Sequence, residues 1–105
     1  MAFNFRSLNR TEAIAHVDSA VPTSLTTVVS ADCMLFEVQI VNPTGSPISV
    51  ALNSITSGNF IIPTINVPAG GVLTLTNRRG RFCQGGVQWQ AGGSGLTGYI
   101  QSSPS

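Results

Sequence analysis

The sequence predicts an all-β protein, either an antiparallel β-sandwich or a small jelly-roll-like barrel of about seven or eight short strands. Runs of Val, Ile, Leu and Thr alternate with polar residues at period two, the pattern of half-buried strands. Clusters of Gly, Pro, Asn and Ser interrupt these runs about every 8–12 residues. No segment has a convincing helical periodicity, which disfavours a βαβ fold.

The chain is expected to form one domain. Its 105 residues, 42% of them hydrophobic, are enough for a single core. Residues 1–10 are interpreted as an extended N-terminal arm, 11–101 as the domain, and 102–105 as a polar C-terminal tail. No apolar run approaches the length of about 18 residues that a membrane-spanning helix needs.

The clearest strands are predicted at 33–42 and 48–52. In the first, alternation places Phe36, Val38 and Ile40 on the core face. The segment 42–47, NPTGSP, has the composition of a turn, because proline fixes φ and glycine permits positive φ. We therefore expect these two strands to form a hairpin.

The other strands are shorter, and their limits follow from proline and glycine. Residues 11–17 fit either a helical turn or a strand, and their periodicity does not choose. A turn is expected at 77–81. Strands are predicted at 23–30, 72–76, 87–90 and 96–101. An apolar run at 60–62 is followed by 64–67, which Pro63 and Pro68 bracket, and proline confines a strand to an edge or to its ends.

Charged residues are scarce. The chain has five arginines, no lysine, four carboxylates and a net charge of +1. An isolated soluble domain carries about a quarter charged residues, so we expect a neutral surface that contacts neighbouring molecules. Arg78, Arg79 and Arg81 form the one dense charged cluster. It is interpreted as a solvated turn, a contact for an acidic protein partner or, less favoured, a contact for nucleic acid.

No set of residues indicates catalysis. His16 is the sole histidine, the carboxylates show no paired spacing, and no phosphate-binding glycine motif is present. The sequence therefore predicts a protein that is not an enzyme and that needs no cofactor or metal.

Two cysteines, Cys33 and Cys83, allow a single pairing. Both have apolar neighbours and are interpreted as buried thiols. The alternative is a disulfide between them, against which a cytoplasmic origin argues.

Trp89 and Tyr99 lie on successive predicted strands and are flanked by Gln88, Gln90 and Gln101. A single tryptophan in a small β-domain usually belongs to the core. The alternative is that Trp89 and Tyr99 are exposed and bind a glycan, as in carbohydrate-binding or adhesive modules.

The segments IVNPTGSPISVAL, IPTINVPAGGVLTLT and GVQWQAGGSGLTGYI resemble small β-sandwich proteins of bacteriophage virions. The resemblance covers roughly residues 33–101. It implies a structural virion protein, such as a capsid decoration (cement) protein, a minor capsid protein or a tail subunit. Such a protein would be made in the host cytoplasm, become part of the virion, and bind copies of itself and other virion proteins, with no membrane partner. Phe3 and Phe5 of the arm, with Arg78, Arg79 and Arg81, are the candidate contacts.

Overall fold

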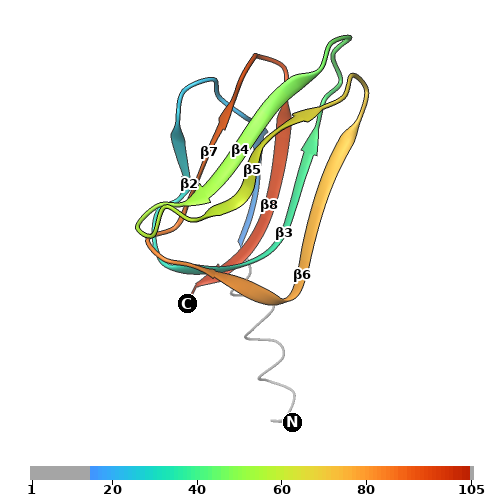
Figure 1. The fold of residues 1–105 in the computed structure, drawn as a ribbon. Coiled ribbons are helices and arrows are strands. Elements are labelled where there is room, and N and C mark those ends of the chain that lie inside the picture. The colour runs from blue at the N-terminus through green and yellow to red at the C-terminus, as the bar shows by residue number, and fades with distance from the viewer. Residues whose placement is uncertain (1–14, 105) are drawn as a thin grey trace.

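The computed structural model describes residues 15–104, with side chains from Val17 onward. This part of the chain forms eight β-strands (Figure 1). No helix in it is long and apolar enough to span a membrane. The strands are β1 (Ala15–Ala20), β2 (Thr26–Val29), β3 (Cys33–Val41), β4 (Ile48–Ser54), β5 (Phe60–Val67), β6 (Val72–Cys83), β7 (Val87–Ala91) and β8 (Thr97–Pro104).

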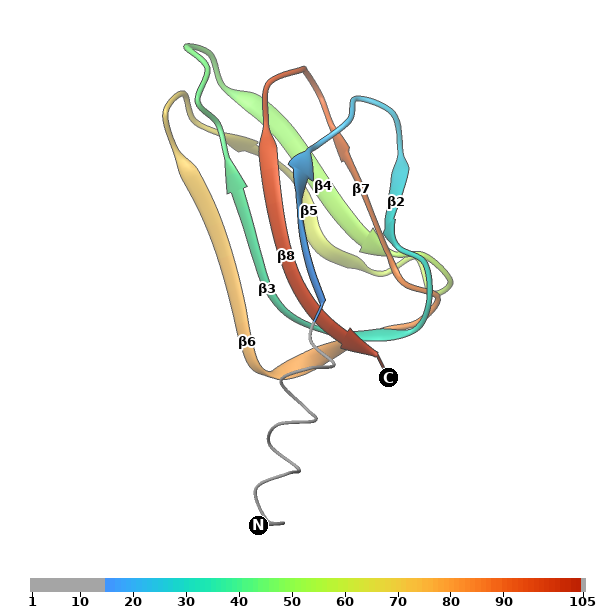
Figure 2. The ribbon, with the colours of Figure 1, turned by 180° about the vertical axis from the view of Figure 1, so that it is seen from behind.

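The strands make two four-stranded antiparallel sheets that face each other. One sheet has the order β1-β8-β3-β6 and the other β2-β7-β4-β5. Figures 1 and 2 show the two sheets from opposite sides. This is the eight-stranded, two-sheet arrangement of a jelly roll. The predicted all-β sandwich is confirmed.

The expected hairpin between residues 33–42 and 48–52 is wrong. The turn forms where predicted, but β3 and β4 belong to opposite sheets. Each strand has an apolar face, and the two faces pack against each other across the core. β3 and β4 are therefore not hydrogen-bonded to each other. Within the described chain, β4 and β5 are the one pair of consecutive strands that are hydrogen-bonded neighbours.

Asn42 organises the crossing from β3 to β4. It is fully buried, and its Nδ2 atom donates to the carbonyl oxygens of Ser46, at 2.8 Å, and Val67, at 2.9 Å. Its Oδ1 atom accepts from the backbone N–H of Thr44 at 3.0 Å and from the Thr44 hydroxyl at 2.6 Å. These bonds satisfy the buried amide and join the β3–β4 turn to the end of β5.

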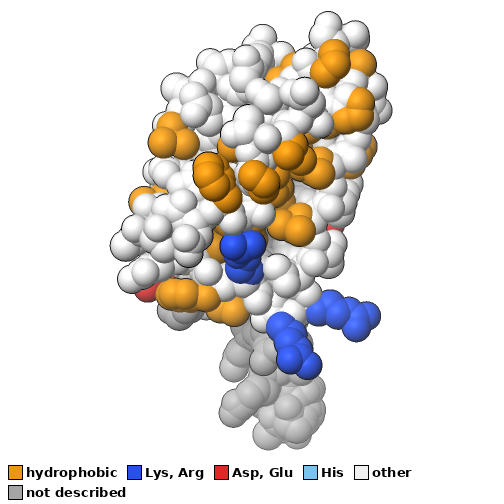
Figure 3. All heavy atoms as spheres, in the orientation of Figure 1, with side chains coloured by type: hydrophobic (Ala, Val, Ile, Leu, Met, Phe, Trp, Pro, Cys, Tyr) orange, Lys and Arg blue, Asp and Glu red, His pale blue; other side chains and the backbone are white. Residues whose placement is uncertain are grey.

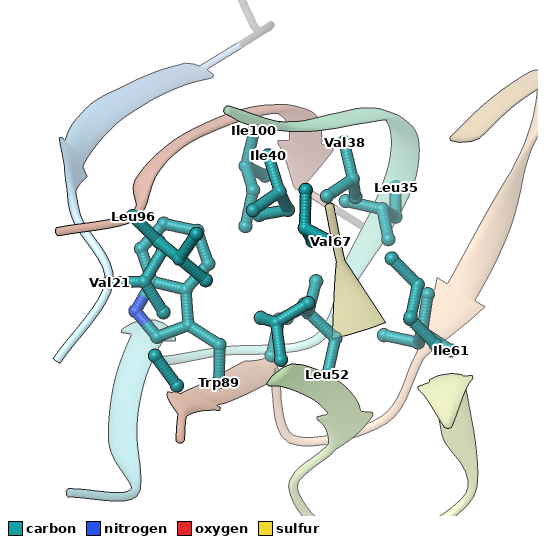
Figure 4. Packing of buried hydrophobic residues seen from close by; sticks show 14 of the residues in the cluster. Val21, Leu35, Val38, Ile40, Leu52, Ile61, Val67, Trp89, Leu96 and Ile100 are labelled. Atoms are coloured by element: carbon teal, nitrogen blue, oxygen red, sulfur yellow. The ribbon is translucent and has the colours of Figure 1, made fainter. Parts of the chain in front are cut away.

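The core lies between the sheets, where Trp89 lies beside Val21 and Leu96 at one end of a cluster of aliphatic side chains (Figure 4). One predicted core residue is misplaced. The pairing of β3 with both its neighbours shifts between Leu35 and Glu37, so Phe36 sits in a bulge. Before the bulge Leu35 faces the core, after it Val38 and Ile40 do, and Phe36 is only half-buried.

The two ends of the described chain pair with each other. Residues 15–20 form a strand, so the strand and not the helical turn is the correct alternative for residues 15–17. Ala15 lies opposite Ser102. The prediction of a polar tail at 102–105 is wrong for residues 102–104, because β8 continues to Pro104 and Ser102 is buried. The expected arm, residues 1–10, lies outside the described residues.

Candidate interaction surface

The predicted turn at 77–81 is instead a bulge inside β6. Between the pairs Leu35–Arg81 and Glu37–Thr76, one residue of β3 faces four residues of β6. Gly80 has φ +84°, a conformation that favours glycine. A Cβ atom at Gly80 would lie 2.9 Å from Cε1 of Phe36. Phe36 thus leaves the core and covers Gly80 at the bulge.

The bulge separates the three clustered arginines. Arg78 and Arg79 are exposed, and neither forms an ion pair within residues 15–104. Arg81 is half-buried, and its Nη2 atom donates to the carbonyl oxygen of Phe60 at 3.0 Å. Since Phe60 is in β5, Arg81 joins the two sheets along the side where β5 and β6 are their outermost strands.

Large apolar side chains are exposed on this same side, which we call the β5–β6 side. Hydrophobic side chains gather over β5 and between β5 and β6, with arginines beside and below them (Figure 3). Phe60 is 56% exposed, Val72 53% and Phe82 51%. Leu73 and Leu75 are partly buried against the core. Val72 begins β6 and Phe82 is next to its end, so the exposed apolar side chains are spread along this side. Exposed apolar surface is typical of contact sites.

Among the sheet edges that the described residues form, the first part of β6 is the least protected. β2 has four residues and a register shift, and β5 contains Pro63 and two register shifts. β1 has six residues, with the exposed carboxylate Asp18 among them. By contrast, Val72–Thr76 pairs with β3 without interruption and contains no charge, proline or bulge. Natural proteins commonly block strand addition with such features, and they are missing from this segment.

The aromatic pair considered for glycan binding is not brought together. Trp89 and Tyr99 are in opposite sheets, and Trp89 is 2% exposed. A Cβ atom at Gly98 would lie 2.4 Å from Cζ3 of Trp89, so the ring is in close contact with the backbone of β8. The interpretation of Trp89 as a core residue is confirmed, and a glycan contact by Trp89 is wrong. Tyr99 is half-buried.

A shallow hollow on the outer face of the β4–β7 sheet does not restore a glycan site. Its volume is about 120 Å³, and its lining includes Ser49, Thr64 and Gln90. No aromatic side chain lines it, so it lacks the flat apolar surface that the glycan interpretation required. Among the described residues, no group of three His, Cys, Asp or Glu side chains could hold a metal ion.

The two cysteines are directly opposite each other on β3 and β6, and both are free thiols. Cys33 is 2% exposed and Cys83 is fully buried. Burial raises the pKa of Cys33 to about 11, and the neighbouring Cys83 adds to this effect. Burial also raises the pKa of Cys83. The expected burial of both cysteines is confirmed.

Comparisons with known proteins assign no family. No family model and no curated protein matches the chain. One similar solved structure is a chain of the Bacillus endospore appendages, described as a family of disulfide-linked pili. It is 16% identical, with a TM-score of 0.43, over 88% of this chain and 86% of that one. A similarity of this size carries no conclusion about function.

The candidate contacts predicted from the sequence are thus only partly located. Phe3 and Phe5 lie outside the described residues. Sequence reasoning also missed Phe60, Val72 and Phe82, because period-two alternation assigns apolar residues to the core and gives no sign that a strand lies at an edge. The uninterrupted run VLTLT, without charge or proline, is the signal that could have identified the unprotected edge.

Proposed function

We propose that this protein is a structural subunit that assembles with copies of itself through the β5–β6 side. The observation that carries the proposal is the coincidence of an unprotected strand edge, Val72–Thr76, with exposed Val72 and half-buried Leu73 and Leu75. Strand addition would satisfy the edge backbone groups and bury the leucines in one step.

Two copies of β6 can pair in antiparallel fashion about a two-fold axis at Thr74. Thr74 then faces Thr74 of the partner subunit, and Leu73 faces Leu75 of the partner subunit. Such a contact uses the same surface on both copies, as two-fold interfaces do. It joins the two sheets that contain β6 into one continuous sheet.

The arginines favour this register. With the axis at Thr74, Arg78 and Arg79 lie beyond the ends of the paired segment, away from their counterparts. An axis near residue 78 would set the arginines of the two copies against each other and would also place the bulge within the ladder. Like charges directly opposite each other destabilise strand pairing, so the charge pattern selects the Thr74 register.

This contact is small, so larger assemblies need a second one. Five paired residues extend about 17 Å, whereas a specific interface usually buries about 800 Å² on each partner. Phe60 and Phe82 lie toward the other end of β6 and stay exposed in the Thr74 pairing. They offer a second apolar contact, for which the expected partners are the arm residues Phe3 and Phe5 of a neighbouring copy. Two contacts on each subunit permit a shell or fibre instead of a closed dimer.

We place this subunit in a bacteriophage virion, as a capsid decoration, minor capsid or tail protein that binds copies of itself and other virion proteins. Support comes from the sequence resemblance, the scarcity of charge and the fold, since jelly rolls form viral capsid domains. They also form lectin domains and cupins, so the fold is an analogy and the contact surface carries the proposal.

A charge exchange at Thr74 tests the self-assembly. Thr74→Lys and Thr74→Glu each put like charges opposite each other at the two-fold axis and should leave the protein monomeric. An equimolar mixture of the two variants should associate again, because opposite charges then meet. The measurement is light scattering with size-exclusion chromatography over a concentration series.

Thr97→Lys is the matched control, since Thr97 is an exposed threonine on the central strand β8. It should associate like the wild type. A wild-type protein that stays monomeric at millimolar concentration would contradict the proposal, as would Thr74→Lys assembling normally. Deletion of residues 2–10 tests the arm separately and should prevent growth beyond the dimer.

A further inference from the structure

The base of the sandwich, where β3 begins and β6 ends, contains both cysteines of the chain. Cys33 and Cys83 are directly opposite partners in an antiparallel ladder, so their side chains leave the sheet on the same face. The neighbouring Cys83 contributes to the raised pKa of Cys33. The Cys83 thiol donates to the carbonyl oxygen of Arg81 at 3.5 Å.

The ladder geometry meets the requirements of a disulfide. Directly opposite residues in antiparallel strands have Cα atoms about 4.5 or 5.5 Å apart, depending on the type of pair. Disulfides span Cα separations of about 4.4–6.8 Å. Both types of pair fall within this range, so a bond requires rotation of side chains and little movement of the backbone.

Cys33 is in the lining of a surface hollow, although only 2% of the residue is exposed. A mostly apolar hollow of about 160 Å³ opens at the base of the sandwich, and its lining includes Cys33, Val29, Ala31 and Pro104. Cys83 does not line this hollow and lies behind Cys33. A small reagent would therefore meet Cys33 first.

We propose that Cys33 and Cys83 are a disulfide-forming pair that, once oxidised, fastens the edge strand β6 to β3 at the base of the sandwich. The bond would form within one chain, because Cys33 and Cys83 are opposite each other in one ladder and both are buried from other protein chains. It would hold the four-residue bulge between two fixed points, the disulfide below and the Glu37–Thr76 pair above. This inference does not depend on the proposed assembly.

The oxidant is a small disulfide such as oxidised glutathione. The Cys33 thiolate attacks the disulfide of the reagent, forming a mixed disulfide and releasing one glutathione thiolate. The Cys83 thiolate then attacks the Cys33 sulfur and releases the second. The protons lost by the two cysteines are taken up by the two glutathione thiolates. Two protein thiols are oxidised and one small disulfide is reduced.

The test compares wild-type protein refolded from urea with oxidised glutathione and wild-type protein refolded with a reductant. Refolding exposes both thiols, so burial in the native state cannot prevent the reaction. We expect the oxidised protein to be a monomer on a non-reducing gel, to lack two hydrogen atoms in its intact mass, and to contain no free thiol. Its melting temperature should rise by on the order of 10 °C, because the bond closes a long loop. A reductant should reverse the increase.

Cys33→Ala and Cys83→Ala are the matched controls. Each keeps one thiol and cannot close the bridge, so its melting temperature should not respond to the oxidant. The proposal is overturned if the refolded wild type keeps both thiols or forms linked dimers through them. It is equally overturned if the bridged protein melts at or below the temperature of the reduced protein. These readouts leave the assembly proposal unaffected, since that is tested at Thr74.

Discussion

The Nδ2 atom of Asn42 donates a hydrogen bond to the carbonyl oxygen of Val67, 2.9 Å away and 25 residues later in the chain. This bond joins the turn after β3 to the end of β5. The turn from β3 to β4 and the turn from β5 to β6 each lead from one sheet of the sandwich to the other. A single buried amide therefore connects the two crossings at this end of the molecule.

Replacing Asn42 with alanine should lower the free energy of unfolding by about 2–4 kcal/mol, because the buried bond to the Val67 carbonyl and the partly buried bond to the Ser46 carbonyl are both lost. Urea denaturation measures the change. Asn66→Ala is the control, since Asn66 is exposed on β5 and its loss should change stability by less than about 0.5 kcal/mol. Equal effects of the two substitutions would refute a special role for Asn42.

Gly98→Ala should destabilise the protein by about 2–3 kcal/mol through overpacking. The added methyl group would lie 2.4 Å from Cζ3 and 2.6 Å from Cη2 of Trp89, so the ring or β8 must move. Thermal unfolding and tryptophan fluorescence report the two effects together. In the control Gly45→Ala the methyl group meets nothing within 4 Å, and little change is expected. An unshifted melting temperature in Gly98→Ala would contradict the close packing.

Gly80→Ala should cost about 2–3 kcal/mol, because alanine is strained at positive φ and its methyl group would meet Phe36. Gly70→Ala separates these causes. Gly70 has φ +71° but no atom within 4 Å of the added methyl group, so its replacement should cost only about 1 kcal/mol. Chemical denaturation of both variants provides the comparison. Similar losses would show that contact with Phe36 contributes nothing.

The reduced protein should lose stability in alkaline solution. Burial, with the adjacent Cys83, raises the pKa of Cys33 from 9.0 to about 11. A pKa higher in the folded than in the unfolded state gives a stabilisation that is complete below pH 9 and is lost as the pH rises through about 11. Urea unfolding midpoints between pH 8 and 11 should therefore fall.

The double variant Cys33→Ala, Cys83→Ala is the control for this pH dependence. It lacks both thiols, so its midpoint should fall less over the same range. Midpoints that fall in parallel in the two proteins would assign the effect to other groups.

The sequence predicts the strands well because each strand needs only local alternation and a turn at its end. It does not predict which strands pair. β3 and β4 have the pattern of a hairpin, yet their apolar faces meet across the core, and nothing local distinguishes the two outcomes. The position of Phe36 was missed for a related reason, since a bulge reverses the alternation and leaves no mark in the hydrophobic pattern.

The candidate contacts were only partly predictable. The density of arginine in residues 78–81 is visible in the sequence, but the engagement of Arg81 with the Phe60 carbonyl depends on β5 and β6 lying at the same side of the sandwich. Exposure of Phe60 and Phe82 likewise follows from strand order. The pairing of Cys33 with Cys83 was one of two interpretations, and only the register of β3 and β6 brings the thiols together.

The pairing of Ala15 with Ser102 has a consequence for how the protein is made. β8 lies between β1 and β3, so their sheet is incomplete until β8 has left the ribosome. Until then, the core faces of β1 and β3 have no strand between them and remain open to solvent or to other nascent chains. Folding of this jelly roll therefore cannot finish before β8 is available to pair with β1 and β3. Its speed is governed by the slow meeting of segments that are far apart in the chain.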